Sequence, residues 1–471
     1  MVGYSYLDKL QEEVYKVRLL PNHKNNIEYR DNQYDKYSHL FPIDFIRLAQ
    51  YSGDELQDIL IAYQNYIRKD LIRVFTTQST KIMESDLSNF LNTKISTAYD
   101  PKTKELRNNP VGREYLKDYL RDIFYKTKRK TDFYSNPLDC LDNVRHIHKS
   151  IFLSIYFHKD NTTFSIARIV QYIKNSYNLG VVQNFRPLSS AVIIDRYAIQ
   201  PNKTKKDITI ICPSEGFFGR LLSTYYIAQL YPNHNIYYHT IDPNATLQEP
   251  FHKFCLKLKN LTPLFPIANW FPHFYCFGSE TPRANFKETM NLEADLIWTS
   301  PPYFETELYV SSVDMLLTRT KDFDLNHKFI TTLQPQSKEH QLLQLEKTLE
   351  IDKLKVGDTY THNNDNYTIL KISNDVQSHS IANSIEGWNE LFFRCTCKNM
   401  FNSLRLGGYM CWNVANTRPH PTLGQDVVRI CKEEGLTHID TIFYSLPRRP
   451  ANQSVKPPYE PVFVFQKKGQ K

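Results

Sequence analysis

The sequence predicts an α/β protein, in which a parallel, doubly wound sheet follows a mainly helical N-terminal region and is interrupted by an insertion. Up to about residue 180, apolar residues recur at helical spacing. From residue 181, short β-branched and aromatic runs alternate with helical stretches, and the alternation breaks after Glu307. We therefore divide the chain into an N-terminal region (1–180), the first part of the core (181–307), an insertion (308–379) and the second part of the core (380–471).

The N-terminal region contains two stretches with helical spacing, 54–63 and 112–124, and each predicts a helix. A basic run at 126–130 is followed by Phe133 and Tyr134. This run is either a solvated loop between helices or a patch that contacts phosphates, with the two rings available for stacking. The region could also bind a protein partner.

The first part of the core contains four runs that predict strands, at 207–212, 235–241, 274–277 and 295–298. A helix is expected between the first two, at 221–230. Strands and helices that alternate at this spacing are typical of a parallel sheet. In such sheets ligands bind at the carboxyl ends of the strands, so we expect the functional residues to follow the strands directly.

The insertion predicts a helix at 341–349 and a β-hairpin, whose strands at 355–361 and 367–372 flank a polar turn. The hairpin is either a recognition element or an elaborated surface loop.

The second part of the core predicts an amphipathic helix at 388–404, closed by a glycine cap at 406–408. A buried strand is expected at 409–414. Two closing strands are expected at 441–444 and 461–465, and they could pair in an antiparallel way.

Composition sets the class of protein. The net charge of +8 on 471 residues is compatible with a nucleic-acid partner without proving one. The sequence has neither a run of roughly 18 apolar residues nor an N-terminal signal-peptide core, so no membrane segment is expected. The eight cysteines form no CxxC pair, which is typical of reduced thiols in an intracellular protein. We expect a soluble, cytoplasmic protein. No metal site is expected, because Cys395 and Cys397 form a lone CxC whose spacing is not typical of metal ligands.

The most informative stretch is Thr299-Ser300-Pro301-Pro302-Tyr303, which follows the apolar run 294–298 and precedes Phe304. Two consecutive prolines fix φ and remove two N–H donors, so the carbonyl groups here remain as acceptors. The stretch is either a plain proline-rich turn or a rigid turn that presents a polar group and an aromatic ring to a ligand.

Three further positions follow predicted strands. Gly216 and Gly219 lie in the turn after 207–212, where the missing side chains would let a ligand approach the backbone, although a simple turn explains them as well. Asp242 ends the second strand and suits either ribose hydroxyls or a helix N-cap. Glu280, past the third strand, is either a ligand contact or surface charge.

The order of these motifs resembles that of the S-adenosylmethionine-dependent DNA amino-methyltransferases, which methylate N4 of cytosine or N6 of adenine. The resemblance covers residues 181–307 and 380–471. It rests on Asn184-Phe185-Arg186-Pro187, the segment 212–222, Ile241-Asp242-Pro243-Asn244, Gly278-Ser279-Glu280, the segment 299–304 and Leu406-Gly407-Gly408-Tyr409. The chain resembles a subgroup of methylases from phages and large DNA viruses more specifically. This resemblance rests on the order Phe-Arg-Pro, a short helix and then Pro-x-x-Gly-x-x-Gly-Arg-Leu-Leu. If the protein is viral, its expected location is the cytoplasm of the host cell.

The resemblance implies a Rossmann-like methyltransferase sheet, S-adenosylmethionine as the cofactor and DNA as the partner. The residues expected to bind the cofactor are Phe185, Pro187, Pro213, Gly216, Gly219, Asp242, Glu280 and Thr299. Phe185 and Pro187 would pack against the cofactor adenine, although ordinary core packing explains them as well. The residues expected to form the catalytic turn are Ser300, Pro301, Pro302 and Tyr303. The residues expected to contact DNA are Phe304, Arg448 and Arg449, together with Lys456, although plain surface charge explains the three basic residues as well. The insertion is the candidate target-recognition region, in which the hairpin would read a DNA groove.

In such an enzyme the Ser300 hydroxyl and the Pro301 carbonyl accept hydrogen bonds from the base amine, and Tyr303 stacks on a base flipped out of the duplex. The protein would be a site-specific methyltransferase of the restriction–modification kind. Serine at position 300 favours cytosine N4 over adenine N6, because serine is commoner among the N4 enzymes.

The sequence departs from the family pattern at two positions. Cys212 stands where an acidic residue is usual, and Phe218 stands where a third glycine is usual. A missing carboxylate would remove a partner for the methionine ammonium, at a cost of about 1.5–3 kcal/mol. The alternative is therefore a catalytically degenerate methyltransferase fold that serves as a DNA-binding or scaffold subunit. An RNA or protein-glutamine methyltransferase is a third possibility, against which Ser300 and the insertion argue.

Overall fold

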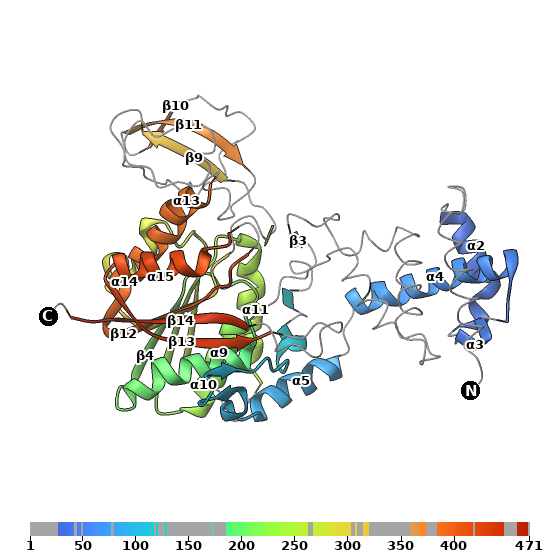
Figure 1. Cartoon of the computed structure of the whole chain (residues 1–471), viewed down its shortest axis with the longest axis horizontal. Helices are drawn as coiled ribbons and strands as arrows, with labels where there is room; N and C mark the ends of the chain where they lie inside the picture. The colour runs from blue at the N-terminus through green and yellow to red at the C-terminus, as the bar shows by residue number, and fades with distance from the viewer. Residues whose placement is uncertain are drawn as a thin grey trace. The chain divides into compact units, whose positions relative to one another are not determined.

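The structure is a computed structural model. It describes residues 27–41, 45–48, 50–76, 80–116, 119–120, 128–129, 172, 185–261, 267–302, 307–308, 314–319, 359–362, 365–373, 384–417, 420–446 and 459–469. The chain forms two compact units (Figure 1). One comprises Met1–Thr80 and Phe124–Gln183, and the other comprises Lys81–Ile123 and Asn184–Lys471.

The first unit is helical over most of its described residues. Its elements are α2 (Ile27–Tyr37), η2 (Ser38–Leu40), α3 (Phe45–Leu48), α4 (Gly53–Thr76) and the short strand β3 (Lys128–Arg129). The predicted helix at 54–63 is confirmed within α4, whose buried residues Leu56, Ile59, Leu60 and Tyr63 recur at helical spacing. The Asn65 amide donates to Asp31 Oδ1 of α2 over 2.9 Å, so a polar contact joins α2 to α4.

The second unit is built on a sheet that has nine strands among the described residues, in the order β1-β2-β13-β14-β12-β7-β4-β5-β6. The strands are β1 (Tyr99–Asp100), β2 (Glu105–Leu106), β4 (Asp207–Cys212), β5 (Asn235–Ile241), β6 (Trp270–Tyr275), β7 (Ala294–Thr299), β12 (Leu404–Asn413), β13 (Leu436–Ser445) and β14 (Tyr459–Lys467). Neighbours from β6 to β12 pair in parallel, whereas β14 is antiparallel to both β12 and β13. The predicted parallel sheet and its antiparallel closing pair are confirmed.

The chain reverses its direction across the sheet between β4 and β7. From β4 it moves outward through β5 to the edge strand β6, and then returns to β7 on the other side of β4. Ile210 of β4 lies opposite Leu296 of β7, and Ile211 lies opposite Ile297. A reversal of this kind is a topological switch point, and ligands of doubly wound sheets bind outside the carboxyl ends of the strands at that point.

Helices cover both faces of this sheet (Figure 1). They are α5 (Thr80–Asn92), α9 (Pro187–Ile194), α10 (Gly219–Leu230), α11 (Gln248–Lys259), α12 (Phe286–Met290), α13 (Ile385–Trp388), α14 (Cys395–Ser403) and α15 (Leu423–Glu433). Short 3-10 and π-helical turns join them: η3 (Ile95–Ala98), η5 (Asp195–Ile199), η6 (Gln200–Asn202), η7 (Ala245–Leu247), η8 (Pro282–Ala284) and η11 (Asn389–Arg394).

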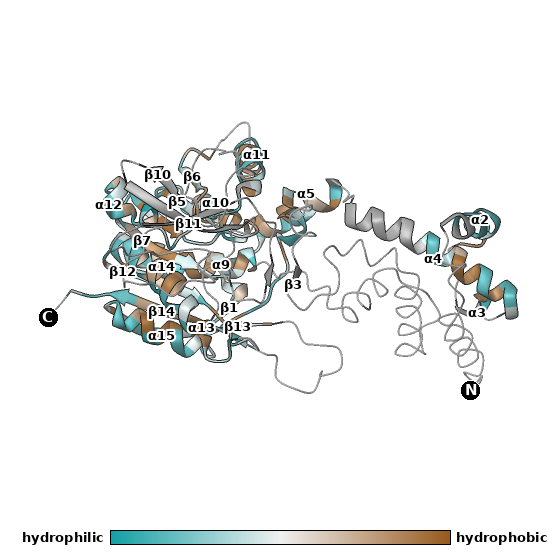
Figure 2. Ribbon diagram, turned by 90° about the horizontal axis from the view of Figure 1, so that it is seen from above, coloured by the Kyte–Doolittle hydropathy of each residue, from teal (hydrophilic) through white to brown (hydrophobic). Residues whose placement is uncertain are grey.

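Neighbouring residues of β7 show how the two layers are arranged. The Trp298 indole donates to Ser190 Oγ of α9 over 2.8 Å. Ile297 instead belongs to the core cluster of Met400 from α14 and Val427 from α15. Because successive strand residues point to opposite faces, α9 lies on one face, and α14 and α15 lie on the other. In Figure 2, α15 accordingly has a hydrophobic and a hydrophilic side.

A buried carboxylate holds the amino end of β7. Asp295 is fully buried and accepts from Lys205 Nζ at 2.6 and 2.7 Å and from Arg405 Nε at 2.5 Å. It also accepts from the backbone N–H of Thr209 in β4 over 2.9 Å. These bonds tie β7 to β4 and β12 at the end of the sheet opposite the switch-point loops.

The insertion contains a small antiparallel sheet. Its strands are β9 (Asp314–Arg319), β10 (Thr359–His362) and β11 (Asp365–Ser373), in the order β10-β11-β9. The predicted hairpin is confirmed as β10–β11, and β9 adds a strand that was not predicted. A short strand, β8 (Glu307–Leu308), precedes it. The helix expected at 341–349 lies outside the described residues.

Two local predictions are corrected. The glycine cap at 406–408 is wrong, because α14 ends at Ser403 and the glycines lie inside β12. The β12–β7 register shifts between Leu404 and Tyr409, so Gly407, with φ at +78°, belongs to a bulge. The third core strand starts earlier than 274 and includes Pro272, which β6 tolerates because it is an edge strand.

None of the helices in the described ranges has both the length and the apolar character that crossing a membrane requires.

Candidate active site at the carboxyl edge of the sheet

Two predicted motifs meet at the switch point. A direct hydrogen bond joins the loop after β4 (residues 213–218, here the β4–α10 loop) to the turn that begins at the last residue of β7 (residues 299–302, here the TSPP turn). The Thr299 hydroxyl donates to the backbone carbonyl of Ser214 over 3.1 Å. Cys212 Sγ lies 3.9 Å from the same hydroxyl. Segments that are far apart in the sequence therefore form one surface between β4 and β7.

Gly216 gives the β4–α10 loop an open flank. Its φ is +64°, and no described atom lies within 4 Å of the position that a Cβ would occupy. Its N–H donates to Asp242 Oδ2 over 3.0 Å. The left-handed conformation explains why glycine stands here, and the open flank leaves room for a ligand against the backbone. Gly219 is buried and begins α10.

Phe218 shows how the loop accommodates the absence of a third glycine. It adopts φ +58°, a left-handed conformation that costs a side-chain-bearing residue about 1–2 kcal/mol. Its fully buried ring lies 5.8 Å from the Phe251 ring and 5.7 Å from the Phe254 ring, both of α11. The ring therefore packs in the core, and burial of a large apolar group offsets the backbone strain.

Cys212 faces a buried cation instead of supplying a carboxylate. Arg220 Nε donates to Cys212 Sγ over 3.1 Å, and Nη2 donates to the carbonyls of Ser214 and, over 2.8 Å, Glu215. Arg220 is only 5% exposed. Burial raises the pKa of the Cys212 thiol, which is the opposite of what a nucleophilic cysteine needs.

Glu215 is a buried acid that the sequence reasoning missed. Its Oε2 accepts from Tyr238 OH and from Thr240 Oγ1 (2.8 Å), both of β5, and its Oε1 accepts from the N–H of Leu221 (3.3 Å). Burial raises the pKa of the Glu215 carboxyl, while the charge of Arg220 opposes that shift. Tyr238 and Thr240 share one face of β5, but nothing in the sequence indicates which residue they contact.

Asp242 lies just after β5 and accepts hydrogen bonds from two loops, while its ribose contact stays a prediction. Its Oδ1 accepts from the N–H of Asn244 over 3.0 Å, as a capping residue does. Its Oδ2 accepts from Gly216 and so connects the turn after β5 to the β4–α10 loop. Burial raises the pKa of Asp242 to about 6, so the carboxylate is mostly ionised at neutral pH.

Glu280 follows β6 at the same edge and is 3% exposed, which rules out the surface-charge interpretation. Its carboxylate folds over Gly278, where an added Cβ would lie 2.3 Å from Oε1. The Asn399 amide of α14 donates to the carbonyls of Ser279 and Thr281, over 3.0 and 2.7 Å, and so holds this loop.

Phe185 and Pro187 lie beside α9. The Phe185 ring packs edge-on to Trp298 at 4.9 Å and against Tyr444 at 4.6 Å. Pro187 opens α9, and its carbonyl accepts from Ser223 Oγ of α10 over 2.7 Å. These are contacts of ordinary core packing, and a ligand contact for either residue stays a prediction.

The TSPP turn itself is half-buried. Thr299 and Pro301 are buried, whereas Ser300 and Pro302 are partly exposed at the end of β7. Pro213, in the facing loop, is buried as well. The remaining predicted residues lie outside the described residues: Tyr303, Phe304, Arg448, Arg449 and Lys456.

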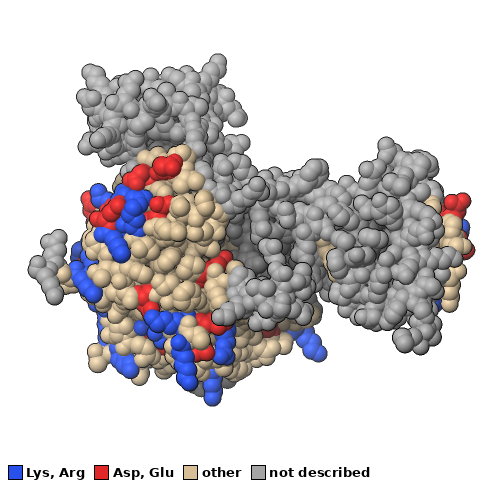
Figure 3. Space-filling model, in the orientation of Figure 1, with Lys and Arg blue, Asp and Glu red and all other residues tan. Residues whose placement is uncertain are grey.

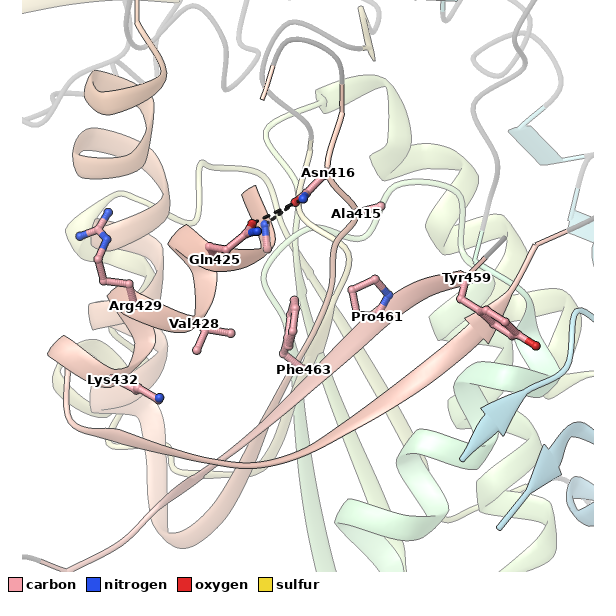
Figure 4. A pocket seen from close by; sticks show the side chains of 10 residues that line it. Ala415, Asn416, Gln425, Val428, Arg429, Lys432, Tyr459, Pro461 and Phe463 are labelled. Carbon is pink, nitrogen blue, oxygen red and sulfur yellow. Dashed lines mark hydrogen bonds between the residues drawn. The ribbon is translucent and has the colours of Figure 1, made fainter. Parts of the chain in front are cut away.

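A hollow of about 770 Å³ opens on the same edge of the sheet, between α15 and β14 (Figure 4). Its lining residues are Ala415, Asn416, Gly424, Gln425, Val428, Arg429, Lys432, Tyr459, Pro461 and Phe463. Asn416 Oδ1 accepts from the N–H of Gly424 over 2.9 Å, which fixes one amide at the rim. The sequence reasoning did not identify this hollow.

The charges near this hollow are balanced. Arg429 lies 3.2 Å from Asp426 and 3.3 Å from Glu433. On the face drawn in Figure 3, acidic and basic side chains are likewise interspersed over the described residues. Neither the hollow nor this face is therefore a uniformly basic surface.

No model of a known protein family matches the sequence, and no curated protein matches it either. The likenesses to solved structures are partial. The N-methyltransferase NodS from Bradyrhizobium japonicum WM9 is 10% identical, with a TM-score of 0.27 over 59% of this chain and 94% of NodS. NodS has also been solved with S-adenosyl-L-homocysteine.

Two further structures extend this comparison. TrmN from Thermus thermophilus is 9% identical, with a TM-score of 0.28 over 65% of this chain and 69% of TrmN. A precorrin-6y C5,15-methyltransferase from Geobacter metallireducens GS-15 is also 9% identical, with a TM-score of 0.25 over 59% of this chain and 86% of that enzyme. Likenesses of this size do not decide an activity. The strand order and the switch point themselves define an α/β, Rossmann-like fold.

Proposed function

We propose that this protein is an S-adenosylmethionine-dependent DNA methyltransferase that methylates an exocyclic base amine, with cytosine N4 favoured over adenine N6. One observation carries the proposal. The β4–α10 loop and the TSPP turn lie on the two sides of the switch point and are joined by the Thr299–Ser214 hydrogen bond. A methyl donor at the first and an amine at the second would be held next to each other.

The residues on the donor side fit such a cofactor. Gly216 leaves an open flank in which the methionyl part can approach the backbone. Each Asp242 oxygen accepts one backbone N–H and keeps a further lone pair for a ribose hydroxyl. We assign the adenine amino group to Glu280. When bound, the cofactor supplies an electrophilic methyl group on a sulfonium sulfur.

On the acceptor side the chain's own groups would position the amine. The amine is a poor nucleophile because its lone pair is conjugated into the ring. The Ser300 hydroxyl and the Pro301 carbonyl can each accept one of its N–H bonds, which favours a pyramidal nitrogen with its lone pair directed at the donor. Tyr303 would stack on the base after it has left the duplex.

The proposed DNA contacts rest on loops and on the insertion. The hairpin β10–β11, together with β9, is the candidate recognition segment, and Arg448 and Arg449 are the candidate phosphate contacts. The net charge of +8 supports a nucleic-acid partner. We propose the N-terminal region (1–180) as the candidate site for a protein partner.

A second candidate function is favoured by the Arg220 contacts. The guanidinium engages Cys212 Sγ and two loop carbonyls, so a positive charge already lies where the positively charged amino group of a methyl donor would bind. A protein that had lost the cofactor would keep the fold and serve as a DNA-binding or scaffold subunit.

Calorimetric titration separates the two candidates. An active enzyme binds S-adenosylmethionine and S-adenosyl-L-homocysteine, and ligand at about 100 times Kd adds about 2.7 kcal/mol to the stability of the fold. Ser300→Ala should keep that binding and lose methyl transfer. If neither ligand binds or raises the Tm, the enzyme proposal is refuted and the scaffold proposal stands.

A further inference from the structure

The carbonyl oxygen of Ser214 is shared by both sides of the switch point. It accepts from Thr299 Oγ1 (3.1 Å) on the TSPP turn, from Cys212 Sγ (3.3 Å) and from Arg220 Nη2. Of these donors, Arg220 alone is charged, and hydrogen bonds to charged groups are about twice as strong as neutral ones. The position of this one carbonyl therefore depends on the guanidinium.

Arg220 is itself held in place. It lies in the first turn of α10, is 5% exposed, and also donates to Cys212 Sγ and to the Glu215 carbonyl. The Glu215 side chain is bonded to Tyr238 and Thr240 of β5. Arg220 is thus anchored in α10, and the β4–α10 loop is anchored to β5 through Glu215.

We propose that Arg220 is a positioning residue that, through the Ser214 carbonyl, sets the distance between the β4–α10 loop and the TSPP turn. Its fork of donors gathers the loop carbonyls on one side, while Thr299 attaches the turn to the same oxygen. Lysine cannot reproduce this arrangement, because a single ammonium lacks the planar fork. In the proposed enzyme this distance would align the methyl donor with the base amine, and that catalytic role of Arg220 rests on the proposed function.

The test is hydrogen–deuterium exchange of the full-length protein without cofactor. In Arg220→Lys, amides of the β4–α10 loop and of 298–300 should both exchange roughly 10- to 150-fold faster, the equivalent of losing a charged hydrogen bond of about 1.5–3 kcal/mol. The matched control is Arg405→Lys, which loosens the other end of β7 at Asp295 and should leave the β4–α10 loop unchanged. Faster exchange in the loop alone, with 298–300 unchanged, overturns the proposal.

Thr299→Val tests the same coupling from the other side and keeps the question decidable if Arg220→Lys does not fold. Coupling between two sites is reciprocal, so this variant should speed exchange in the β4–α10 loop. An unchanged loop contradicts the proposal. Calorimetry on the same samples reports cofactor binding separately. If the wild type binds no cofactor but exchange is coupled, the proposed function fails and the positioning role stands. In an active enzyme, Arg220→Lys should lower kcat by a larger factor than it raises Kd.

Discussion

Gly216→Ala tests whether the β4–α10 loop is a ligand cradle or only a turn. At φ +64° an alanine adds about 1–2 kcal/mol of backbone strain. No described atom lies within 4 Å of the new methyl group, so a steric cost within the described residues is not expected. A bound ligand would meet the methyl group directly. Losing close contact with the loop would cost about 1.5–3 kcal/mol, or roughly 10- to 150-fold in Kd.

The matched control is Gly53→Ala in the first unit. Gly53 has φ +58° and also has no described atom within 4 Å of its Cβ position, so the backbone penalty is the same and only the location differs. Both variants should lower the Tm, by amounts set by the strain. Calorimetric titration with S-adenosyl-L-homocysteine should show weaker binding for Gly216→Ala alone. Equal affinity in the wild type and in both variants would refute the ligand cradle.

Three further outcomes are expected. A protonated Asp242 loses acceptor capacity, so binding of S-adenosyl-L-homocysteine should weaken in a pH-series titration as pH falls through about 6. Asp242→Asn should abolish that pH dependence. The contribution of Asp242 to fold stability should increase over the same fall in pH, because its raised pKa makes the folded state take up the proton first. Phe218→Gly should lower the unfolding free energy measured in urea by about 1–4 kcal/mol, since the lost burial of about 3–5 exceeds the relieved strain of about 1–2; an unchanged or higher value would show that strain dominates. Asp295→Asn should cost about 3 kcal/mol in the same assay, near the lower end for a broken buried pair because Lys205 and Arg405 are partly exposed and can turn to solvent; a cost below about 1 kcal/mol would remove its anchoring role.

The sheet was largely predictable because its strands carry a local signal. The β-branched runs at 207–212 and 235–241 coincide with β4 and β5, and the apolar run before Thr299 coincides with β7. The strands β1 and β2 were not predicted, since two-residue strands have no periodicity. Their attachment to the sheet includes a contact that no local pattern encodes, because Phe443 of β13 donates its N–H to the Lys104 carbonyl over 2.9 Å.

The candidate site was predictable only where a motif follows a strand. Gly216, Asp242 and Thr299 were named from that rule. Gly216 is hydrogen-bonded to Asp242, and Thr299 is hydrogen-bonded to Ser214 in the loop that contains Gly216. Arg220 and Glu215 were missed. Their partners lie on β5 or along the loop backbone, and a sequence does not show which buried groups face each other.

The departure at Phe218 has a physical explanation that sequence reasoning lacked. A bulky residue in place of the third glycine was one of the two departures that favoured a catalytically degenerate fold. In the structure the ring is buried against α11, and the open flank belongs to Gly216. The departure at Cys212 has no such compensation. The family pattern has a carboxylate at this position, whereas here the Cys212 thiol faces the Arg220 cation.

The central claim is methyl transfer to a base amine at the TSPP turn. The direct measurement is mass spectrometry of nucleosides from DNA incubated with the protein and S-adenosylmethionine that carries a deuterated methyl group. The account predicts labelled N4-methyldeoxycytidine with the wild type and a large loss of label with Ser300→Ala. Absence of label from every base with the wild-type protein, or equal labelling by Ser300→Ala, would contradict it.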